Sequence, residues 1–224
     1  MYAPINRSII IKEMNTYKNQ ISQAVIRRLP KYYRRLGELK AKGISKVSSN
    51  ELSKILGYTA SQIRQDLNNF GGFGQQGYGY SVDNLYTEIE KILGLNKKYN
   101  MIIVGFGRLG QAMGSYIINN EPNFKIVGIF DIKQIVQYAD HEEFKDAQIM
   151  TCEEISTFVK KHKVDVALIT VPSYKAQLVA KVVANAGIKG IWNFTGVDLD
   201  IPDNIKVQNV HASDSLHALA YYLK

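Results

Sequence analysis

Cysteine is nearly absent from the 224-residue sequence, and no hydrophobic run is long. A single cysteine, Cys152, excludes an internal disulfide and a metal site built from several cysteines, which fits the reducing cytoplasm. We expect it to be a small buried hydrophobe rather than a redox group. The apolar stretches are of the size of 164–171, far below the roughly 20 residues of a membrane-spanning helix. Residues 1–18 are predicted to be a flexible leader, because Ile9-Ile10-Ile11 is too short for a signal sequence.

Acidic residues are scarce in the first third of the chain. Residues 1–80 contain 13 Lys or Arg and 4 Asp or Glu, a net charge of +9, whereas residues 81–224 contain 15 and 16, a net charge of −1. A strongly basic segment before a nearly neutral one indicates that the first part binds a polyanion. A solvated basic surface without a partner is the alternative.

The basic part predicts three consecutive helices. The first covers about 22–43, with Pro30 as an expected kink. The second begins at Ser48, which forms a capping box with Glu51, and it ends at the turn Gly57-Tyr58. A third helix follows this short turn directly, which is the pattern of a helix-turn-helix.

The outer face of the third helix is rich in amides and nearly free of carboxylates. Gln and Asn can pair with both major-groove polar groups of adenine, and Arg suits a guanine edge or a phosphate. We therefore expect an A·T-rich DNA site, with an ordinary solvent-exposed face as the alternative. The side chains on this face are Ser61, Gln62, Arg64, Gln65, Asn68 and Asn69.

The glycine-rich segment 71–80 alternates aromatic and small residues, which predicts a β-hairpin, the wing of a winged helix. A hairpin lined by glycine can approach a minor groove closely, and Gln75 and Gln76 are expected at its tip. A further helix over about 82–93 should lead to a domain boundary at 96–98.

A dinucleotide-binding fingerprint comes next. Gly105-Phe106-Gly107-Arg108-Leu109-Gly110 follows the apolar run 101–104, opens a helical pattern, and is followed twenty-one residues later by Asp131. In order, its glycines permit the tight turn, the approach of the backbone to a pyrophosphate, and the packing of the helix on the strand. Asp131 should bind the adenosine ribose and repel a 2′-phosphate, which favours NAD over NADP.

From residue 99 onward strands and helices alternate, which predicts a doubly wound parallel sheet. Ligands bind beyond the carboxyl ends of such strands. We therefore expect Thr170-Val171-Pro172 and Asn193-Phe194-Thr195 near the nicotinamide, although Pro172 and Phe194 have turn or packing roles as alternatives. The expected strands cover 101–104, 125–130, 148–150, 164–171 and 188–192, and the helices 109–119, 153–162 and 174–186.

No catalytic residue and no metal site are predicted. A dehydrogenase needs a group that relays protons and a domain that holds substrate, and neither is evident; Tyr174-Lys175, for example, lacks the spacing of a hydride-transfer pair. A sensor is favoured over an enzyme. Two alternatives stay open: an NAD-dependent oxidoreductase with an accessory basic domain, and a constitutive DNA-binding protein with a structural nucleotide pocket. The apolar helix expected over 213–223 should dock on a partner subunit or on its own domain.

From about residue 20 the chain resembles the Rex family of redox-sensing transcriptional repressors. The motifs that carry the resemblance are 27–34 (RRLPKYYR), Ser48-Ser49, 62–67 (QIRQDL), Phe70-Gly71 with 77–80 (GYGY), 105–110, Thr170-Val171-Pro172 and 190–194 (GIWNF). The resemblance implies a homodimer that exchanges its C-terminal helices, binds double-stranded DNA at an A·T-rich inverted repeat, and leaves it when NADH replaces NAD. Two recognition helices of such a dimer would meet successive major-groove faces, which explains a palindromic site.

Together, the pattern and the resemblance assign residues to three roles. The expected cofactor-binding residues are Gly105, Gly107, Arg108, Leu109, Gly110, Tyr116, Asp131, Ile132, Thr170, Val171, Pro172, Asn193 and Phe194. The expected DNA-binding residues are Arg28, Ser48, Ser49, Ser61, Gln62, Arg64, Gln65, Asn68, Gln75, Gln76 and Tyr78. The expected coupling residues are Arg34, Tyr116 and His211.

Two positions depart from the family pattern. Arg34 and Tyr116 resemble the pair that meets an acid from the partner subunit, but this chain has Val210-His211 where the family has Val-Asp. Gln65 stands where many relatives carry Lys. We therefore hypothesise a DNA-binding member whose response to NADH is altered or weakened, because His211 cannot supply the negative charge of the switch.

The expected fold is α/β, with an N-terminal winged helix, a Rossmann-type doubly wound parallel sheet and a C-terminal domain-swapped helix. The expected parts are the leader (1–18), a DNA-binding domain (19–95), an NAD(H)-binding domain (96–207) and a dimerisation helix (208–224). The predicted function is a cytoplasmic repressor that senses the NADH/NAD ratio.

Overall fold

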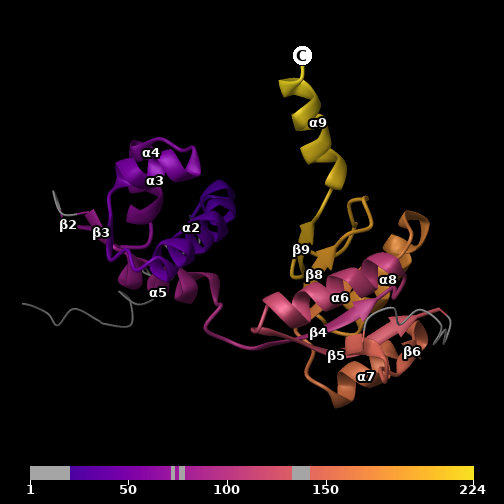
Figure 1. Ribbon diagram of the computed structural model, residues 1–224. Coiled ribbons are helices and arrows are strands. Elements are labelled where there is room, and N and C mark those ends of the chain that lie inside the picture. Colours follow the sequence, from indigo (N-terminus) through magenta and orange to yellow (C-terminus); the bar gives the residue numbers. More distant parts are fainter. Residues whose placement is uncertain (1–20, 72–73, 76–78, 133–141) are drawn as a thin grey trace, which may run out of the picture. The chain divides into compact units, whose positions relative to one another are not determined.

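The computed structural model describes residues 21–71, 74–75, 79–132 and 142–224. The backbone forms two compact units that divide between Asn96 and Lys97 (Figure 1). The expected leader, Gln76 and Tyr78 lie outside the described residues, and the side chain of Gln75 is likewise not described.

The first unit contains the predicted helix-turn-helix. Ser48 accepts a hydrogen bond from the backbone of Glu51 and donates its own N–H to the Glu51 side chain, which is the expected capping box. The second helix ends at Gly57, in the left-handed conformation (φ +75°) that favours glycine. The helices are α2 (Gln23–Ala41), α3 (Ser49–Leu56), α4 (Ala60–Asn68) and α5 (Val82–Leu93).

A three-stranded antiparallel sheet completes this unit. Its strands are β1 (Lys46–Val47), β2 (Gly74–Gln75) and β3 (Gly79–Ser81), in the order β1-β3-β2. Gly74 pairs with Tyr80, and Gln75 pairs with Gly79. The antiparallel pairing of β2 with β3 thus confirms that the segment contains a hairpin. β1 was not predicted, because two residues are too few to show a strand pattern.

All four helices contribute to the core of the first unit. α2 contributes Leu29, Tyr32 and Leu36, each at most 1% exposed. The other buried members of this apolar cluster are Val47, Leu52, Ile63, Leu67, Tyr80, Val82, Leu85 and Ile89. Because these side chains face inward, the polar side of α4 is left toward solvent.

The second unit is a six-stranded parallel sheet in the order β6-β5-β4-β7-β8-β9. Numbered along the chain from β4, the strands stand in the order 3-2-1-4-5-6, which is that of a Rossmann fold. The strands are β4 (Tyr99–Val104), β5 (Phe124–Asp131), β6 (Ile149–Thr151), β7 (Val166–Ile169), β8 (Gly190–Asn193) and β9 (Lys206–Asn209).

Helices cover both faces of this sheet. α7 (Ile155–Lys161) and α8 (Ser173–Asn185) pack on the face of Ile102, Val104 and Ala167. α6 (Arg108–Asn120) buries Ile117 on the face of Met101, Ile103 and Leu168. Adjacent residues of β4 and β7 thus point to opposite faces, as in a central strand buried on both sides.

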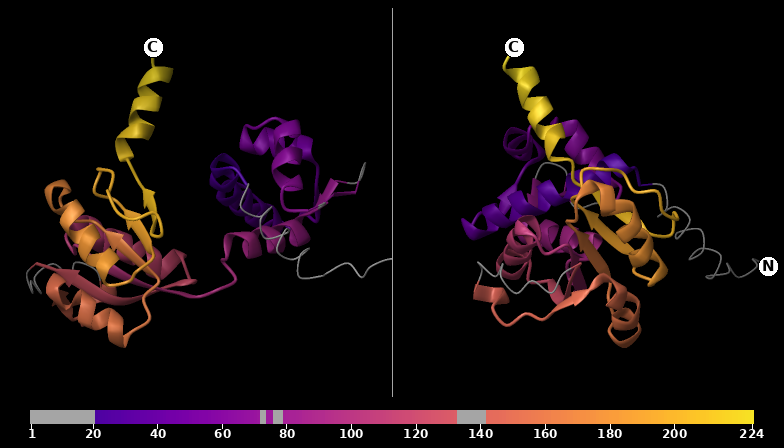
Figure 2. Two further views of the ribbon diagram at one scale, coloured as in Figure 1. Left: turned by 180° about the vertical axis from the view of Figure 1, so that it is seen from behind. Right: turned by 90° about the vertical axis from the view of Figure 1, so that its right-hand side faces the viewer.

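The last part of the chain differs from the expectation in one strand. β9 was not predicted, because Lys206-Val207-Gln208-Asn209 offers one apolar residue and lies at the sheet edge, where polar residues are tolerated. α9 (Ala212–Tyr222) extends away from the sheet beyond β9 (Figure 2), and each of its residues is exposed. None of the helices in the described ranges has both the length and the apolar character needed to cross a membrane.

Candidate nucleotide and nucleic-acid sites

A cleft of about 1020 Å³ lies at the carboxyl ends of the parallel strands. Its lining comes from the segments that follow β4, β5, β6, β7 and β8, together with the start of α8. β4 and β7 are neighbours in the sheet, and the chain leaves them toward opposite sides of it. Open α/β sheets bind ligands at such a switch point.

Glycines make the turn between β4 and α6 narrow. Gly105 has φ +95°, and a Cβ there would lie 2.8 Å from the backbone N of Val171. A Cβ on Gly110 would collide with the carbonyl oxygen of Gly105. At Gly107, in contrast, a Cβ would have no atom within 4 Å. The first two glycines are thus required by close packing, and Gly107 leaves its backbone open to a ligand.

The start of α6 fits a phosphate group. Gly107 is the N-cap residue, and no side chain of the described residues caps the first N–H groups of the helix. Such groups and the helix dipole favour an anion. Arg108 lines the same part of the cleft, so a positive side chain adds to the backbone donors. The residues present therefore fit the pyrophosphate of a dinucleotide.

Asp131 ends β5 and braces the glycine turn. One carboxylate oxygen accepts a hydrogen bond from the Phe106 N–H, and the other accepts one from the Ile132 N–H, each at 2.6 Å. A carboxylate has about four acceptor positions, so two remain for hydroxyl groups in the cleft that Asp131 lines. Asp131 can therefore support the turn and bind a ribose at the same time.

Ten of the thirteen expected cofactor residues line the cleft. They are Gly105, Gly107, Arg108, Leu109, Asp131, Ile132, Thr170, Val171, Pro172 and Phe194. The other three differ in position. Gly110 lies beneath the turn, Tyr116 is 48% exposed further along α6, and Asn193 is 1% exposed with its amide bonded to Val197, Asn209 and Thr195.

Two stretches of the lining were not predicted. They follow β6 and begin α8, and their cleft residues are Cys152, Glu153, Ile155, Ser156, Ser173, Tyr174, Lys175, Leu178, Val179 and Val182. The rule that ligands bind beyond each strand end would have found several of them. Burial, with Asp131 and Glu153 nearby, raises the pKa of Cys152 to about 11, so it is a neutral thiol at pH 7, as expected of a small hydrophobe.

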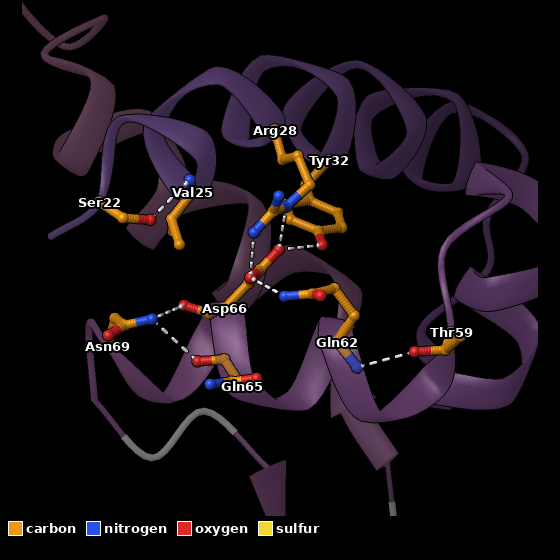
Figure 3. Close-up of polar contacts among 9 residues, drawn as sticks. All are labelled: Ser22, Val25, Arg28, Tyr32, Thr59, Gln62, Gln65, Asp66 and Asn69. Carbon is orange, nitrogen blue, oxygen red and sulfur yellow. Dashed lines mark hydrogen bonds and ion pairs between the residues drawn. The ribbon is translucent and has the colours of Figure 1, made fainter.

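A buried carboxylate positions α4, the second helix of the helix-turn-helix (Figure 3). Asp66 is fully buried and accepts hydrogen bonds from Arg28 Nε (2.6 Å) and Nη2 (2.7 Å), the Tyr32 hydroxyl (2.7 Å) and Gln62 Nε2 (2.9 Å). Burial alone would raise the pKa of Asp66, but these donors hold it below its ordinary value. The carboxylate therefore joins α2 to α4 in its charged form.

This network gives a structural role to two residues that were expected to bind DNA, Arg28 and Gln62. Both were assigned to DNA, yet Arg28 forms an ion pair inside the unit and Gln62 donates its amide to the same carboxylate. No local pattern in the sequence pairs Asp66 with Arg28, because the two residues are 38 positions apart. Both side chains thus take part in the network that joins α2 to α4 within the unit, and their contact with DNA stays a prediction.

Four other residues expected to bind DNA are open to solvent. Ser61, Arg64, Gln65 and Asn68 are exposed on α4. Arg64 donates to the Ser49 hydroxyl at 2.8 Å, which ties the start of α3 to this face. Ser48 uses its hydroxyl and its N–H in the capping box.

The three expected coupling residues lie on different elements. Arg34 is exposed on α2, and within the described ranges no hydrogen bond or ion pair engages it. Tyr116 lies on α6 in the second unit. His211 is the N-cap residue of α9, and its Nε2 lies 3.2 Å from a carboxylate oxygen of Asp198.

Comparison with known proteins gives the same division of the chain. Residues 20–68 match a family model described as "Putative DNA-binding protein N-terminus", and residues 96–197 match one described as "CoA binding domain". The redox-sensing transcriptional repressor Rex of Thermoanaerobacter pseudethanolicus is 48% identical over 206 residues, which are 92% of this chain and 91% of that protein. The Rex of Clostridioides difficile is 48% identical over 204 residues, 91% of this chain and 96% of its own. The chain belongs to the Rex family.

Solved structures of Rex proteins share the fold. A crystal structure of RSP, a Rex-family repressor, has a TM-score of 0.83 and 46% identity over 91% of this chain and 95% of its own. RSP with β-NAD⁺ and operator DNA has a TM-score of 0.82, 48% identity and coverages of 91% and 92%. RSP with β-NADH has a TM-score of 0.81 and 45% identity, over 91% and 94%. The expected winged helix and Rossmann sheet are confirmed, and the Rex relatives are repressors rather than enzymes.

Replacing Asp66 should destabilise the first unit of this Rex-family chain. Asp66→Ala leaves the Arg28 guanidinium, which is 20% exposed, without its partner. Breaking a buried ion pair costs about 3–5 kcal/mol. Hydrogen exchange of the α4 amides should report a loss of about this size in the free energy of opening. The control is Asp83→Ala, which removes an exposed pair with Lys40 and should change little; equal effects of the two variants would contradict the prediction.

Proposed function

We propose that this chain is a DNA-binding repressor that senses the NADH/NAD ratio: as a homodimer it binds an A·T-rich inverted repeat and is released by NADH. The observation that carries the proposal is that one chain holds both a helix-turn-helix with an open amide and arginine face and a Rossmann cleft with an uncapped glycine turn. In domain terms, residues 19–95 bind DNA, residues 96–207 bind NAD(H) and residues 208–224 join the subunits.

Each end of the cofactor has candidate contacts in the cleft. The start of α6, with Gly107 and Arg108, supports binding of the pyrophosphate, and Asp131 supports binding of the adenosine ribose. Phe194 and Thr170 lie at the ends of β8 and β7, where a nicotinamide ring would lie. Oxidised and reduced nicotinamide differ by a ring charge, so a largely apolar wall on this side would favour the neutral, reduced ring.

The exposed face of α4 supports contact with the major groove. Ser61, Arg64, Gln65 and Asn68 point outward from this helix, and amide side chains suit adenine. Arg64, held by Ser49 at 2.8 Å, suits a phosphate or a guanine edge. The wing, which includes Gln75, Gln76 and Tyr78, is assigned to the minor groove.

The C-terminal helix supports a homodimer. Leu216, Leu219 and Leu223 of this segment are 63%, 52% and 78% exposed. Several exposed apolar side chains on one helix mark an interaction surface. We assign them to a partner subunit, with which the helix is exchanged. Such a dimer carries two recognition helices, which matches the two half-sites of an inverted repeat.

Release of DNA requires NADH to bind more tightly to the arrangement that cannot bind DNA than to the one that can. Affinity alone shifts nothing; the difference between two affinities does. A hundredfold loss of DNA affinity corresponds to about 2.7 kcal/mol of coupling, which is within the ordinary range for allostery.

The proposed function is tested with a labelled A·T-rich inverted-repeat duplex. Fluorescence anisotropy at a fixed salt concentration, which DNA affinity depends on, should show tight binding without cofactor and with NAD, and release as NADH is added. Binding that neither cofactor changes would instead indicate a constitutive DNA-binding protein. Consumption of the cofactor with a metabolite would indicate an oxidoreductase.

The absence of an acid at His211 should weaken the NADH response. Asp198 lies next to His211, so a second carboxylate there would be repelled; His211→Asp and its uncharged match His211→Asn are therefore compared in an Asp198→Asn background. We expect NADH to lower DNA affinity about fivefold more in the Asp than in the Asn variant, measured by the same anisotropy titration. Equal responses would refute the hypothesis.

Asp131 should determine the choice of cofactor. Asp131→Ala removes two ribose acceptors and the repulsion of a 2′-phosphate. Since hydrogen bonds to a charged group contribute about 1.5–3 kcal/mol, NADH affinity should fall tenfold or more, while NADPH affinity falls less. Titration calorimetry of both cofactors measures this, with the exposed Asp146→Ala as control. The assignment fails if the unaltered chain binds NADPH as tightly as NADH.

A further inference from the structure

A continuous set of side-chain hydrogen bonds runs from the cleft to the start of α9. The Thr195 hydroxyl donates to Asn193 Oδ1 at 2.7 Å, and Asn193 Nδ2 donates to Asn209 Oδ1 at 2.9 Å. Asn209 Nδ2 donates to Asp198 Oδ1 at 2.6 Å, and His211 Nε2 lies 3.2 Å from that same oxygen. Four short steps thus connect a residue of the cleft lining with the N-cap residue of α9.

The cleft end of this set is buried and fully bonded. Asn193 is 1% exposed, and its Oδ1 accepts from both the backbone N–H and the hydroxyl of Thr195. Its Nδ2 also donates to the Val197 carbonyl at 2.7 Å. Thr195 and its neighbour Phe194 line the cleft. Because a buried polar group without its partners is costly, a ligand that moves Thr195 must also move Asn193 or break its bonds.

The other end determines how α9 leaves the sheet. Among the described residues, α9 buries no side chain, and no side chain caps its first turn. The chain entering it is held by the Val210 N–H on the Asn193 carbonyl (2.8 Å) and by the contact of His211 with Asp198. The direction of α9 within its own subunit therefore depends on these few bonds.

The two ends differ in how easily they open. Asn193 is shielded from water, whereas the Asp198 side chain is 82% exposed, so water can replace the bonds that Asp198 loses. β9 itself is a four-residue edge strand. The bonds of Asn193 are therefore costly to break, and those of Asp198 are not. Such a difference allows α9 to take two directions of similar free energy while the cleft end stays intact.

We propose that Asn193, Asn209 and Asp198 act as a polar relay, which couples the occupant of the cleft beside Thr195 to the direction in which α9 leaves the sheet. The relay rests on the proposed function, since it assumes a nucleotide in that cleft. The three residues are positioning residues: none of them lines the cleft. Through this relay, side chains of the second unit alone connect the cleft with α9, the helix assigned to the contact between subunits.

Hydrogen exchange of residues 206–222, with and without saturating NADH, tests the relay. In the unaltered full-length protein, NADH should change the exchange of the first-turn amides of α9 by about threefold or more. Asp198→Ala and Asn209→Ala each break a different bond of the relay and should lose most of this change, although calorimetry shows NADH still bound. Asp200→Ala is the matched control, because the Asp200 side chain is exposed and makes no hydrogen bond or ion pair within the described ranges.

Equal changes in the Asp198→Ala and Asp200→Ala proteins would overturn the relay. An unaltered protein that binds NADH without any change over 206–222 would overturn it as well, while leaving nucleotide binding intact. A calorimetric titration with no NADH binding would be a different failure, because it would refute the proposed function and the relay together.

Discussion

The close approach of β4, α6 and the segment after β7 is the constraint on which the nucleotide unit depends. Gly105 and Gly110 have no room for a side chain, and the Thr170 hydroxyl donates to the Gly105 carbonyl at 2.5 Å. This contact brings the uncapped start of α6 to the point between β4 and β7 at which the strand order reverses. Asp131 then fastens the turn from the neighbouring strand through the Phe106 N–H. The backbone that would hold a pyrophosphate is thus shaped by packing before any ligand binds, which reduces the ordering that binding requires.

In the first unit, the corresponding constraint is the buried carboxylate of Asp66. α4 buries two apolar side chains of its own, Ile63 and Leu67, and one carboxylate, Asp66. The Asp66 carboxylate, bonded to two side chains of α2 and to Gln62, fixes the rotation of α4 about its own axis because a buried charge tolerates no loss of partners. The exposed amide face follows from this arrangement: when Asp66 points inward, Gln65 and Asn68 point outward.

Local patterns were sufficient to predict most elements. The helix over 82–93 has the predicted bounds, since Ser81 caps its start and Gly94 takes a left-handed conformation at its end. The fingerprint and the strand ends predicted about half of the cleft lining for the same reason, because they depend on neighbours in sequence. The rest depends on distant contacts. β9 forms by pairing with β8. Asn193 is bonded to Asn209 of β9, and Arg28 to Asp66, which lies two helices further along the chain. None of these leaves a periodic signal.

His211 differs from the family pattern in sequence, and it contacts a carboxylate in the structure. Taken as a sequence position, it replaces an acid of the family pattern, and a switch that relies on that negative charge would be weakened. In the structure, His211 lies against Asp198, a carboxylate that is held by Asn209 and largely open to solvent. A negative charge is therefore present within about one side chain's length of the expected place, although it comes from a different loop. Asp198 therefore places a negative charge at this junction, and its carboxylate is hydrogen-bonded through Asn209 and Asn193 to Thr195 in the wall of the cleft.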